Sequence, residues 1–229
     1  MNWSDYMPPL HPEGRKFVLP LGALTVLMVF VAWPLVVIGL VLTLACAYFF
    51  RDPARYVPQS AGMIVSPADG RVQSISQVPP PPELAMGEAP RTRISIFLSV
   101  LDVHVARAPA AATVEKAAYV PGRFFNASLD KASTDNERQL LRLRTDEGHD
   151  LALALIAGLV ARRIVCPLEG GEELERGERI GIIRFGSRAD LYLDPGLIPA
   201  VAVGQVVLGG ETVLAATGAG REAPTAIRR

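Results

Sequence analysis

Gly186 and Ser187 lie between two strand-like runs in the stretch IIRFGSRADLYL. A tight turn is the simplest interpretation, because Gly and Ser are common turn residues. A second interpretation is chemical. Glycine has no side chain to block approach to its carbonyl carbon, so the Ser187 hydroxyl could attack the Gly186 carbonyl in an N→O acyl shift. β-Elimination from the resulting ester would free the Gly186 carboxylate and leave dehydroalanine, which hydrolyses to a pyruvoyl group.

This reaction needs a general base, and His104 is the best candidate. It lies in FLSVLDVHVARAP, where strand alternation would place Asp102 and His104 on one face. A carboxylate beside an imidazole favours its charged form and can fix its tautomer, so Asp102 is a candidate orienting carboxylate. An exposed polar strand face is the alternative. The other histidines, His11 and His149, have flanking sequences typical of solvent-exposed residues.

Asp69 lies in SPADG, and Asp-Gly after Pro-Ala is typical of a β-turn, so a structural role is the first expectation. The hydrolase motif G-x-S-x-G is absent around Ser187, which weighs against attack on an external acyl group. A serine hydrolase acting on lipids therefore remains only a competing hypothesis.

The composition excludes several classes of protein. Lys+Arg and Asp+Glu balance at 23 each, so no bulk charge indicates a nucleic-acid partner. The two cysteines, Cys46 and Cys166, lie far apart and form no disulfide framework. No Cys/His spacing suits a metal ion, so no metal site is expected.

Residues 17–50 carry no charged side chain. A single helix over this run would be about 50 Å long, against a hydrocarbon core of about 30 Å. Pro34 lies near the middle and interrupts a helical ladder, so a helical hairpin or a kinked, tilted span fits better than one rod. Each arm of a hairpin would be short for a full crossing, which leaves a re-entrant anchor open. A cleaved signal peptide and a buried soluble helix pair are the alternatives.

Basic residues flank this apolar run on both sides: Arg15, Lys16, Arg51 and Arg55. This pattern suits a membrane anchor with both ends in the cytoplasm. Arg51 and Arg55 would favour an anionic leaflet or set the topology.

Residues 51–229 consist of short alternating or β-branched runs separated by Gly, Pro and Asp, which predicts a mainly β domain. GMIVSPADGRVQSI and LERGERIGIIRFGSRADLYL both place a glycine-containing turn between strands. Such turns suit a barrel-sandwich-like domain of the lipoyl or biotinyl type. A non-catalytic lipoyl-like adaptor would present a lysine at its hairpin tip, whereas this chain has Gly-Ser there.

Five motifs follow the apolar N-terminus in order: RDPARYVP, IVSPADGRV, IFLSVLDVHVARAP, DNER and GERIGIIRFGSRADLYL. Together they resemble phosphatidylserine decarboxylase proenzymes of the short bacterial type, over residues 45–209. The resemblance implies a lyase that decarboxylates phosphatidylserine to phosphatidylethanolamine and CO2 in phospholipid biosynthesis.

The resemblance also implies roles for particular residues. Cleavage between Gly186 and Ser187 would give a β chain, residues 1–186, and an α chain, residues 187–229, which stay associated. Ser187 would become a covalent pyruvoyl cofactor. Asp69 would belong to an Asp-His-Ser arrangement for self-cleavage, and His104 would act in cleavage, in decarboxylation or in both. Longer members carry a second histidine where this chain has Arg107, so the division of roles between His104 and Arg107 stays open.

The resemblance implies a location as well. The substrate would be phosphatidylserine in the membrane, with residues 1–50 as the anchor and residues 51–229 as the catalytic domain on the cytoplasmic face of the inner membrane. A second copy of the chain, in a homodimer, is a further possible partner. A related pyruvoyl-dependent decarboxylase with another headgroup substrate stays open as an alternative.

Overall fold

The structure is a computed structural model that describes residues 8–125, 135–158, 163–184, 187–217 and 226–228. It divides into two compact units, Met1–Ala54 and Arg55–Arg229. Each unit is described by itself below.

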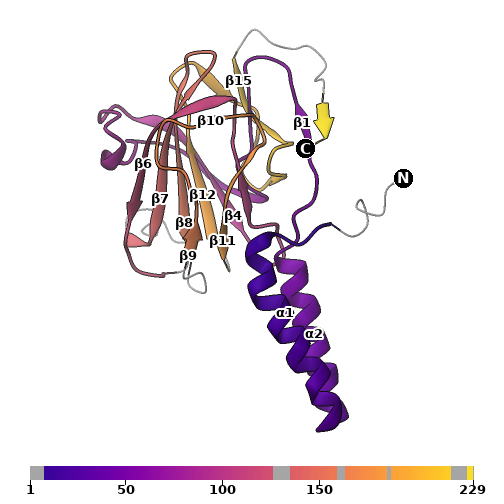
Figure 1. Ribbon diagram of the computed structural model, residues 1–229. Helices are drawn as coiled ribbons and strands as arrows, with labels where there is room; N and C mark the ends of the chain where they lie inside the picture. The colour runs from indigo at the N-terminus through magenta and orange to yellow at the C-terminus, as the bar shows by residue number, and fades with distance from the viewer. Residues whose placement is uncertain (1–7, 126–134, 159–162, 185–186, 218–225, 229) are drawn as a thin grey trace. The chain divides into compact units, whose positions relative to one another are not determined.

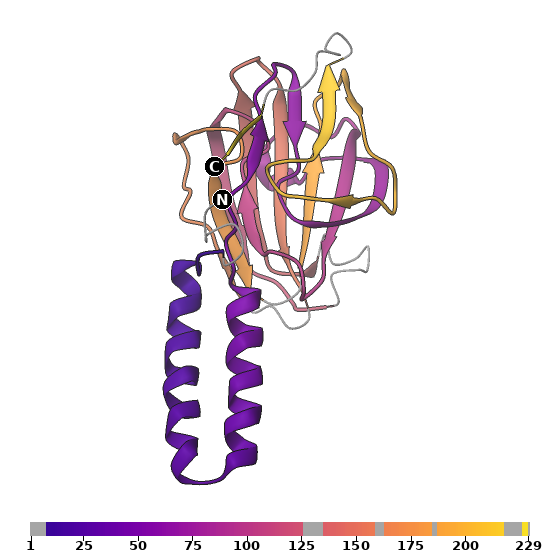
Figure 2. The same ribbon diagram turned by 90° about the vertical axis from the view of Figure 1, so that its right-hand side faces the viewer.

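The first unit is a helical hairpin. Its elements are α1 (Pro12–Leu27), the short helix η2 (Met28–Phe30) and α2 (Trp33–Phe49). The two long helices lie side by side and run in opposite directions (Figure 2). Pro34 occupies the first turn of α2, where a missing N–H has no cost. Of the two arrangements expected from the sequence, the structure therefore shows the hairpin.

Small residues let the two helices approach closely. A Cβ atom added at Gly39 would lie 2.6 Å from the Thr25 hydroxyl oxygen. The Thr25 and Thr43 hydroxyls lie 3.2 Å apart across the helix pair. In the described part of the chain, no helix has both the length and the apolar character that crossing a membrane would require.

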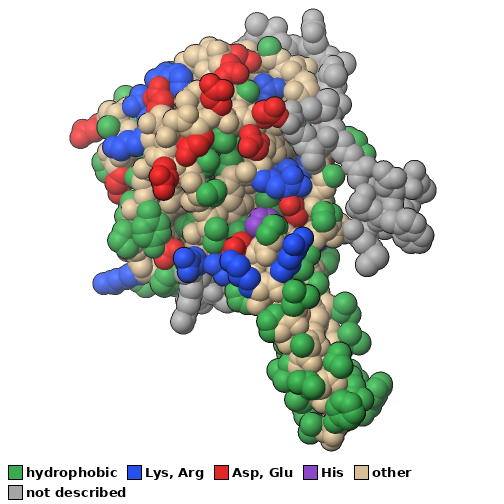
Figure 3. All heavy atoms as spheres, in the orientation of Figure 1, with side chains coloured by type: hydrophobic (Ala, Val, Ile, Leu, Met, Phe, Trp, Pro, Cys, Tyr) green, Lys and Arg blue, Asp and Glu red, His purple; other side chains and the backbone are tan. Residues whose placement is uncertain are grey.

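Apolar side chains cover much of the hairpin surface, and Figure 3 shows them as an almost continuous layer. The exposed large apolar residues of this unit include Leu19, Leu24, Val26, Leu27, Val29, Phe30, Val31, Trp33, Ile38, Leu40, Val41, Leu42 and Leu44. An exposed apolar surface of this extent is typical of a site of interaction with a membrane or another protein.

The second unit is mainly β, as the sequence predicts (Figure 1). Its largest sheet is antiparallel throughout and has the strand order β10-β6-β7-β8-β12-β4-β3-β14. The bounds are β3 Gly70–Val78, β4 Arg91–Leu98, β6 Ala112–Val120, β7 Arg138–Thr145, β8 Asp150–Ala157, β10 Glu173–Leu174, β12 Ser187–Tyr192 and β14 Val206–Val207.

Three smaller sheets complete the unit among the described residues. One has the order β5-β11-β9 (Val105–Arg107, Arg179–Arg184, Arg163–Val165). The second has the order β13-β15-β2 (Leu197–Pro199, Val213–Thr217, Met63–Val65), and the third pairs β1 (Tyr56–Pro58) with β16 (Ala226–Arg228). A short helix, η3 (Pro82–Leu84), lies in the connection between β3 and β4.

The core lies on one face of the large sheet. Ile96 of β4 and Ala189 and Leu191 of β12 pack there with Ile183 of β11 and Leu214 of β15. Burial of alternate residues on a strand drives this arrangement. A second cluster forms on the opposite face, where Leu84 of η3 covers Leu140, Ala152, Ala154, Ile156 and Tyr192. Strand β12 is therefore buried on both faces as well as paired on both edges.

A glycine fixes the start of β3. Gly70 has φ +149°, and a Cβ atom there would lie 2.2 Å from the Phe97 carbonyl oxygen. Only glycine allows this close approach to β4. The Asp-Gly pair of SPADG thus leads straight into the sheet, and Asp69 lies beside the end of β4.

One predicted strand is shorter than expected. Strand β4 ends at Leu98, and residues 99–104 form a turn instead of continuing to His104. The Asp102 carboxylate accepts the Ser99 N–H at 2.7 Å, which competes with strand pairing. The prediction that Asp102 and His104 share a strand face is therefore wrong.

Candidate active site

Ser187 is the first residue of β12, in the middle of the large sheet. Its register partners are Leu98 of β4 and Ala157 of β8. The side chain is completely buried, and its Oγ has no hydrogen-bond partner in the described part of the protein. An unsatisfied buried hydroxyl costs about 1–3 kcal/mol, so its position calls for an explanation other than stability. Gly186 lies outside the described residues.

His104 is also fully buried and directly precedes β5. Its Nδ1 lies 2.9 Å from the Asp102 carbonyl oxygen. A carbonyl oxygen only accepts, so Nδ1 carries the proton and Nε2 is the basic nitrogen of the neutral ring. The sequence predicted that the Asp102 carboxylate orients this ring. The structure corrects the prediction, because the backbone carbonyl of Asp102 holds Nδ1 while its carboxylate binds the Ser99 N–H.

Asp69 is buried and holds two strong contacts. The Arg55 Nη2 donates to its Oδ2 at 2.7 Å, and the Gly209 N–H donates to its Oδ1 at 2.7 Å. Burial raises the pKa of the Asp69 carboxyl, while Arg55 and the Gly209 hydrogen bond lower it; the nearby Asp102 charge raises it further. Asp69 is thus more than a turn residue.

Arg55 departs from its expected role. The sequence placed it at a membrane flank, but its side chain is buried and ion-paired with Asp69. A buried carboxylate requires a partner, and Arg55 supplies it 14 positions away in sequence. The sequence contains both motifs, RDPARYVP and SPADG, but their spacing does not predict that Arg55 and Asp69 form a pair.

Backbone hydrogen bonds link the His104 segment to the segments that carry Asp69 and precede Ser187. The Arg107 N–H donates to the Pro67 carbonyl at 2.8 Å, which sets His104 and β5 beside the Asp69 turn. The Ile183 N–H donates to the His104 carbonyl at 3.1 Å, four residues before Ser187. These main-chain contacts place the His104 backbone next to the SPADG segment and next to β11, the strand that precedes Ser187.

Arg107 does not take the position of a second catalytic base. Its side chain is buried, and its Nη1 donates to the Gly177 carbonyl at 2.9 Å. A guanidinium stays protonated at physiological pH, so it cannot accept a proton. His104 is thus the candidate base in this region.

Two further buried polar groups adjoin Ser187, and the sequence analysis did not single them out. On the opposite face of β12, Arg188 Nη2 donates to Asp190 Oδ2 at 2.9 Å, with both side chains fully buried. The Asn136 Nδ2 donates at 2.8 Å to the carbonyl of Ala157, the register partner of Ser187 on β8. The signal for the first pair was present as two charged residues alternating with apolar ones in SRADLY.

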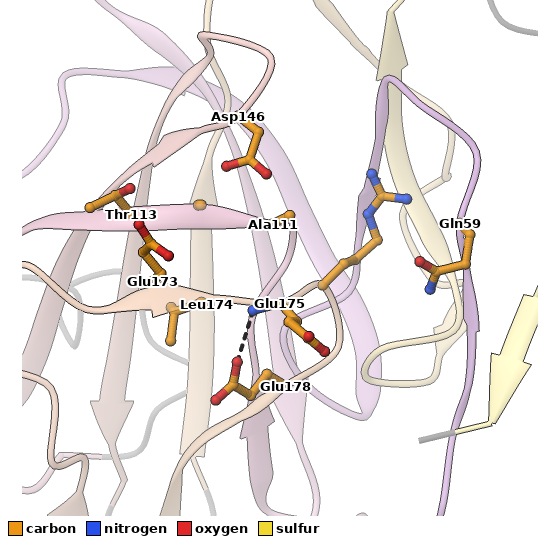
Figure 4. A pocket seen from close by; sticks show the side chains of 10 residues that line it. Gln59, Ala111, Thr113, Asp146, Glu173, Leu174, Glu175 and Glu178 are labelled. Atoms are coloured by element: carbon orange, nitrogen blue, oxygen red, sulfur yellow. Dashed lines mark hydrogen bonds between the residues drawn. The ribbon is translucent and has the colours of Figure 1, made fainter.

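A cavity of about 1040 Å³ beside β10 lies apart from these residues. Figure 4 shows several carboxylates around it, and the dashed line marks the Glu175 N–H donating to Glu178. Asp146 and Glu173 also line it, but Asp69, His104 and Ser187 do not. Its acidic lining is unsuited to an anionic lipid, so the candidate site remains at Ser187.

Comparison with known proteins gives a consistent result. A sequence model of the family described as phosphatidylserine decarboxylase matches residues 42–215. The chain is similar to three relatives, each named phosphatidylserine decarboxylase proenzyme. That of Cereibacter sphaeroides is 54% identical over 93% of this chain and 91% of its own length. That of Ruegeria pomeroyi is 53% identical over 93% and 97%, and that of Zymomonas mobilis is 50% identical over 97% and 93%.

Proposed function

Since the chain belongs to the phosphatidylserine decarboxylase family, we propose that self-processing at Ser187 supplies the carbonyl group with which it works. The protein is an enzyme that decarboxylates phosphatidylserine to phosphatidylethanolamine, and it is made as a proenzyme that processes itself. The observation that carries the proposal is the buried Ser187 hydroxyl without a hydrogen-bond partner among the described residues.

The residues around Ser187 fit a pyruvoyl group. Its precursor hydroxyl is already desolvated, and β4 and β8 hold its backbone from both sides. When formed, the pyruvoyl group withdraws electrons from the amine of the bound substrate, which permits loss of CO2. The protein positions the reacting groups, excludes water from them and transfers protons.

In self-processing, His104 Nε2 takes the proton from the Ser187 hydroxyl. The oxygen attacks the Gly186 carbonyl carbon, the C–N bond breaks, and the former amide nitrogen of Ser187 becomes an amine. Removal of the Ser187 α-proton then expels the Gly186 carboxylate and leaves dehydroalanine. Water hydrolyses this residue to the ketone and releases ammonia. The ionised Asp69 carboxylate is assigned an electrostatic role in this step, as the negative charge of the proposed Asp-His-Ser arrangement.

In decarboxylation, His104 delivers a proton to the substrate carbon that loses CO2. The ring is suited to this task because the Asp102 carbonyl fixes Nδ1 and thereby sets the direction of Nε2. Complete burial of His104 limits access of water. The same side chain thus serves both stages.

We also propose that the two chains stay associated after cleavage. Residues 187–229 contribute β12, which pairs along its whole length with β4 and β8 of the preceding chain. They also contribute β13 and β15, which pair with each other, and β15 also pairs with β2 of the preceding chain. Breaking one peptide bond at the start of β12 leaves these ladders intact. The curled sheet and the smaller sheets together support a barrel-sandwich-like architecture.

Residues 1–50 are proposed to anchor the enzyme in the membrane, with residues 51–229 as the cytoplasmic catalytic domain. Support comes from the exposed apolar surface of the hairpin. Helices of 16 and 17 residues are about 24–26 Å long, shorter than a hydrocarbon core of about 30 Å. We therefore favour a re-entrant anchor over a full crossing.

Trapping of the carbonyl group tests the proposal directly. Active enzyme treated with hydroxylamine is expected to lose activity and to gain one adduct, at the N-terminus of a fragment that begins at position 187. Intact-mass analysis and peptide mapping identify the adduct. An active preparation that keeps a continuous chain through positions 186 and 187, with no adduct, would contradict the scheme.

A pH profile tests the role of Arg55. Arg55→Gln removes the charge that lowers the pKa of Asp69, so this pKa is expected to rise further. Processing needs the ionised carboxylate, so the acid limb of the processing rate should move to higher pH. A raised carboxyl pKa also means that folded-state stability decreases as pH rises through that pKa. The measurement is the rate of chain cleavage after cell-free synthesis, at a series of pH values.

Two variants control this experiment. Arg55→Lys keeps the charge and should leave the acid limb near its original position, although with weaker geometry. Arg144→Gln removes an exposed arginine that pairs with Glu115 and should change nothing. An unshifted limb in Arg55→Gln would show that Arg55 does not act through Asp69.

A further inference from the structure

The strand register places three chain segments around Ser187. Leu98 ends β4 and Ala157 ends β8, and both are partners of Ser187, so residues after Leu98 leave the sheet at this end. Arg184, the last residue of β11, is three residues from Ser187, a Cα path of at most about 11 Å. Side chains on these segments therefore form the rim of the proposed site.

An apolar tip follows β4 on this rim. Val100 is 56% exposed and Leu101 is 66% exposed. The turn that carries them is held by the Asp102 carboxylate on the Ser99 N–H, by the Ser99 hydroxyl on the Leu101 N–H at 3.3 Å, and by the Asp102 N–H on the Ser99 carbonyl. This turn is pre-organised, so it holds two large apolar side chains in solvent where burial would stabilise them.

A pair of arginines lies on the same rim. Arg163 of β9 and Arg184 of β11 are direct register partners, so their side chains point to the same side. Like charges directly opposite each other on neighbouring strands repel, and an anion bound beside them lowers this repulsion. Arg163 is exposed and forms no ion pair with any residue that the structure describes, while the nearby Glu137 carboxylate accepts the Ile164 N–H. In Figure 3, Lys and Arg side chains follow the edge where β9 and β11 end.

We propose that this rim docks on the surface of a phospholipid bilayer. The Arg163–Arg184 pair receives the phosphodiester of the lipid, and Val100 and Leu101 enter the acyl-chain region beside it. The charges are complementary, because a phosphodiester is an anion and guanidinium groups bind it with two parallel hydrogen bonds. This inference rests on the proposed reaction at Ser187, since it assigns a substrate-binding rim to that site.

Assays with two physical forms of the substrate distinguish the role of the apolar tip from the role of the arginine pair. The full-length, processed enzyme is assayed with short-chain phosphatidylserine dissolved as monomers, and with long-chain phosphatidylserine in phosphatidylcholine vesicles. For the double variant Val100→Ser and Leu101→Ser, the ratio of vesicle to monomer kcat/KM should fall about tenfold, because the lost apolar contact exists only at the bilayer. If the double variant does not mature, Leu101→Ser alone is measured instead. Its vesicle-to-monomer kcat/KM ratio should also fall, but by less.

The arginine variants should behave differently. Arg163→Gln with Arg184→Gln should raise KM about tenfold on both presentations, because both lipids carry the phosphodiester. Arg163→Lys keeps a positive charge, so its KM should rise less than the KM of the double variant. Ile198→Ser is the matched control, since Ile198 is 61% exposed on β13, away from the rim. It should leave both values unchanged.

The outcomes distinguish this inference from the reaction itself. A tip variant with an unchanged vesicle-to-monomer ratio, or arginine variants with unchanged KM, would overturn the docking rim while leaving the chemistry at Ser187 intact. A wild-type enzyme without a cleaved chain or a trapped carbonyl would overturn the chemistry first.

Discussion

Replacing Ser187 with alanine is expected to leave one uncleaved chain and no decarboxylase activity. The alanine lacks the hydroxyl that attacks the Gly186 carbonyl, so neither the ester nor the ketone can form. Folding should survive the change, because the Ser187 Oγ has no hydrogen-bond partner in the described structure and its loss leaves no group unsatisfied. Denaturing gels, intact mass and CO2 release from phosphatidylserine measure the result.

Ser95 provides a matched control for this variant. It lies on the neighbouring strand β4, is 1% exposed, and also has a buried Oγ without a hydrogen-bond partner among the described residues. Ser95→Ala should therefore disturb packing as little as Ser187→Ala does, yet mature into two chains and keep its activity. Two bands from Ser187→Ala would reject self-cleavage at this position.

The sequence predicted the parts of the site that depend on local chemistry. Residue type and spacing predicted a strand after Gly186-Ser187, and β12 begins at Ser187; His104 as the base stays a prediction. Hydropathy and Pro34 predicted either a helical hairpin or a kinked span, of which the structure shows the hairpin, and alternation predicted the mainly β fold. These features depend on short-range pattern, which one chain displays by itself. The assignment of catalytic roles stays a prediction.

The remaining features depend on contacts between distant segments. Arg55 meets Asp69 only because β1 and the SPADG turn are brought together, and isolated sequence shows Arg55 as one more basic residue after an apolar run. The prediction that Asp102 lies on a strand was wrong for a local reason. Its carboxylate accepts the Ser99 N–H and so closes a turn. A period-two pattern cannot reveal where a side chain ends the strand.

Replacing His104 with alanine is expected to reduce both stages of the reaction. In the proposed mechanism Nε2 takes the Ser187 proton, and general-base catalysis contributes typically about 10²–10⁴-fold. Processing should slow by a factor of this size, and the fraction that matures should also decarboxylate more slowly. Pulse–chase synthesis measures the first rate, and CO2 release per mole of trapped carbonyl measures the second.

Normalising activity to the carbonyl content separates the two roles of His104. A variant that processes slowly but decarboxylates normally per carbonyl would restrict His104 to self-cleavage, and the reverse would restrict it to the turnover reaction. His149→Ala is the control, because that histidine is partly exposed and lies 3.4 Å from Asp194 rather than near Ser187. If His104→Ala matures and turns over at the wild-type rate, the base lies elsewhere, and the buried imidazole held by the Asp102 carbonyl has a structural role only.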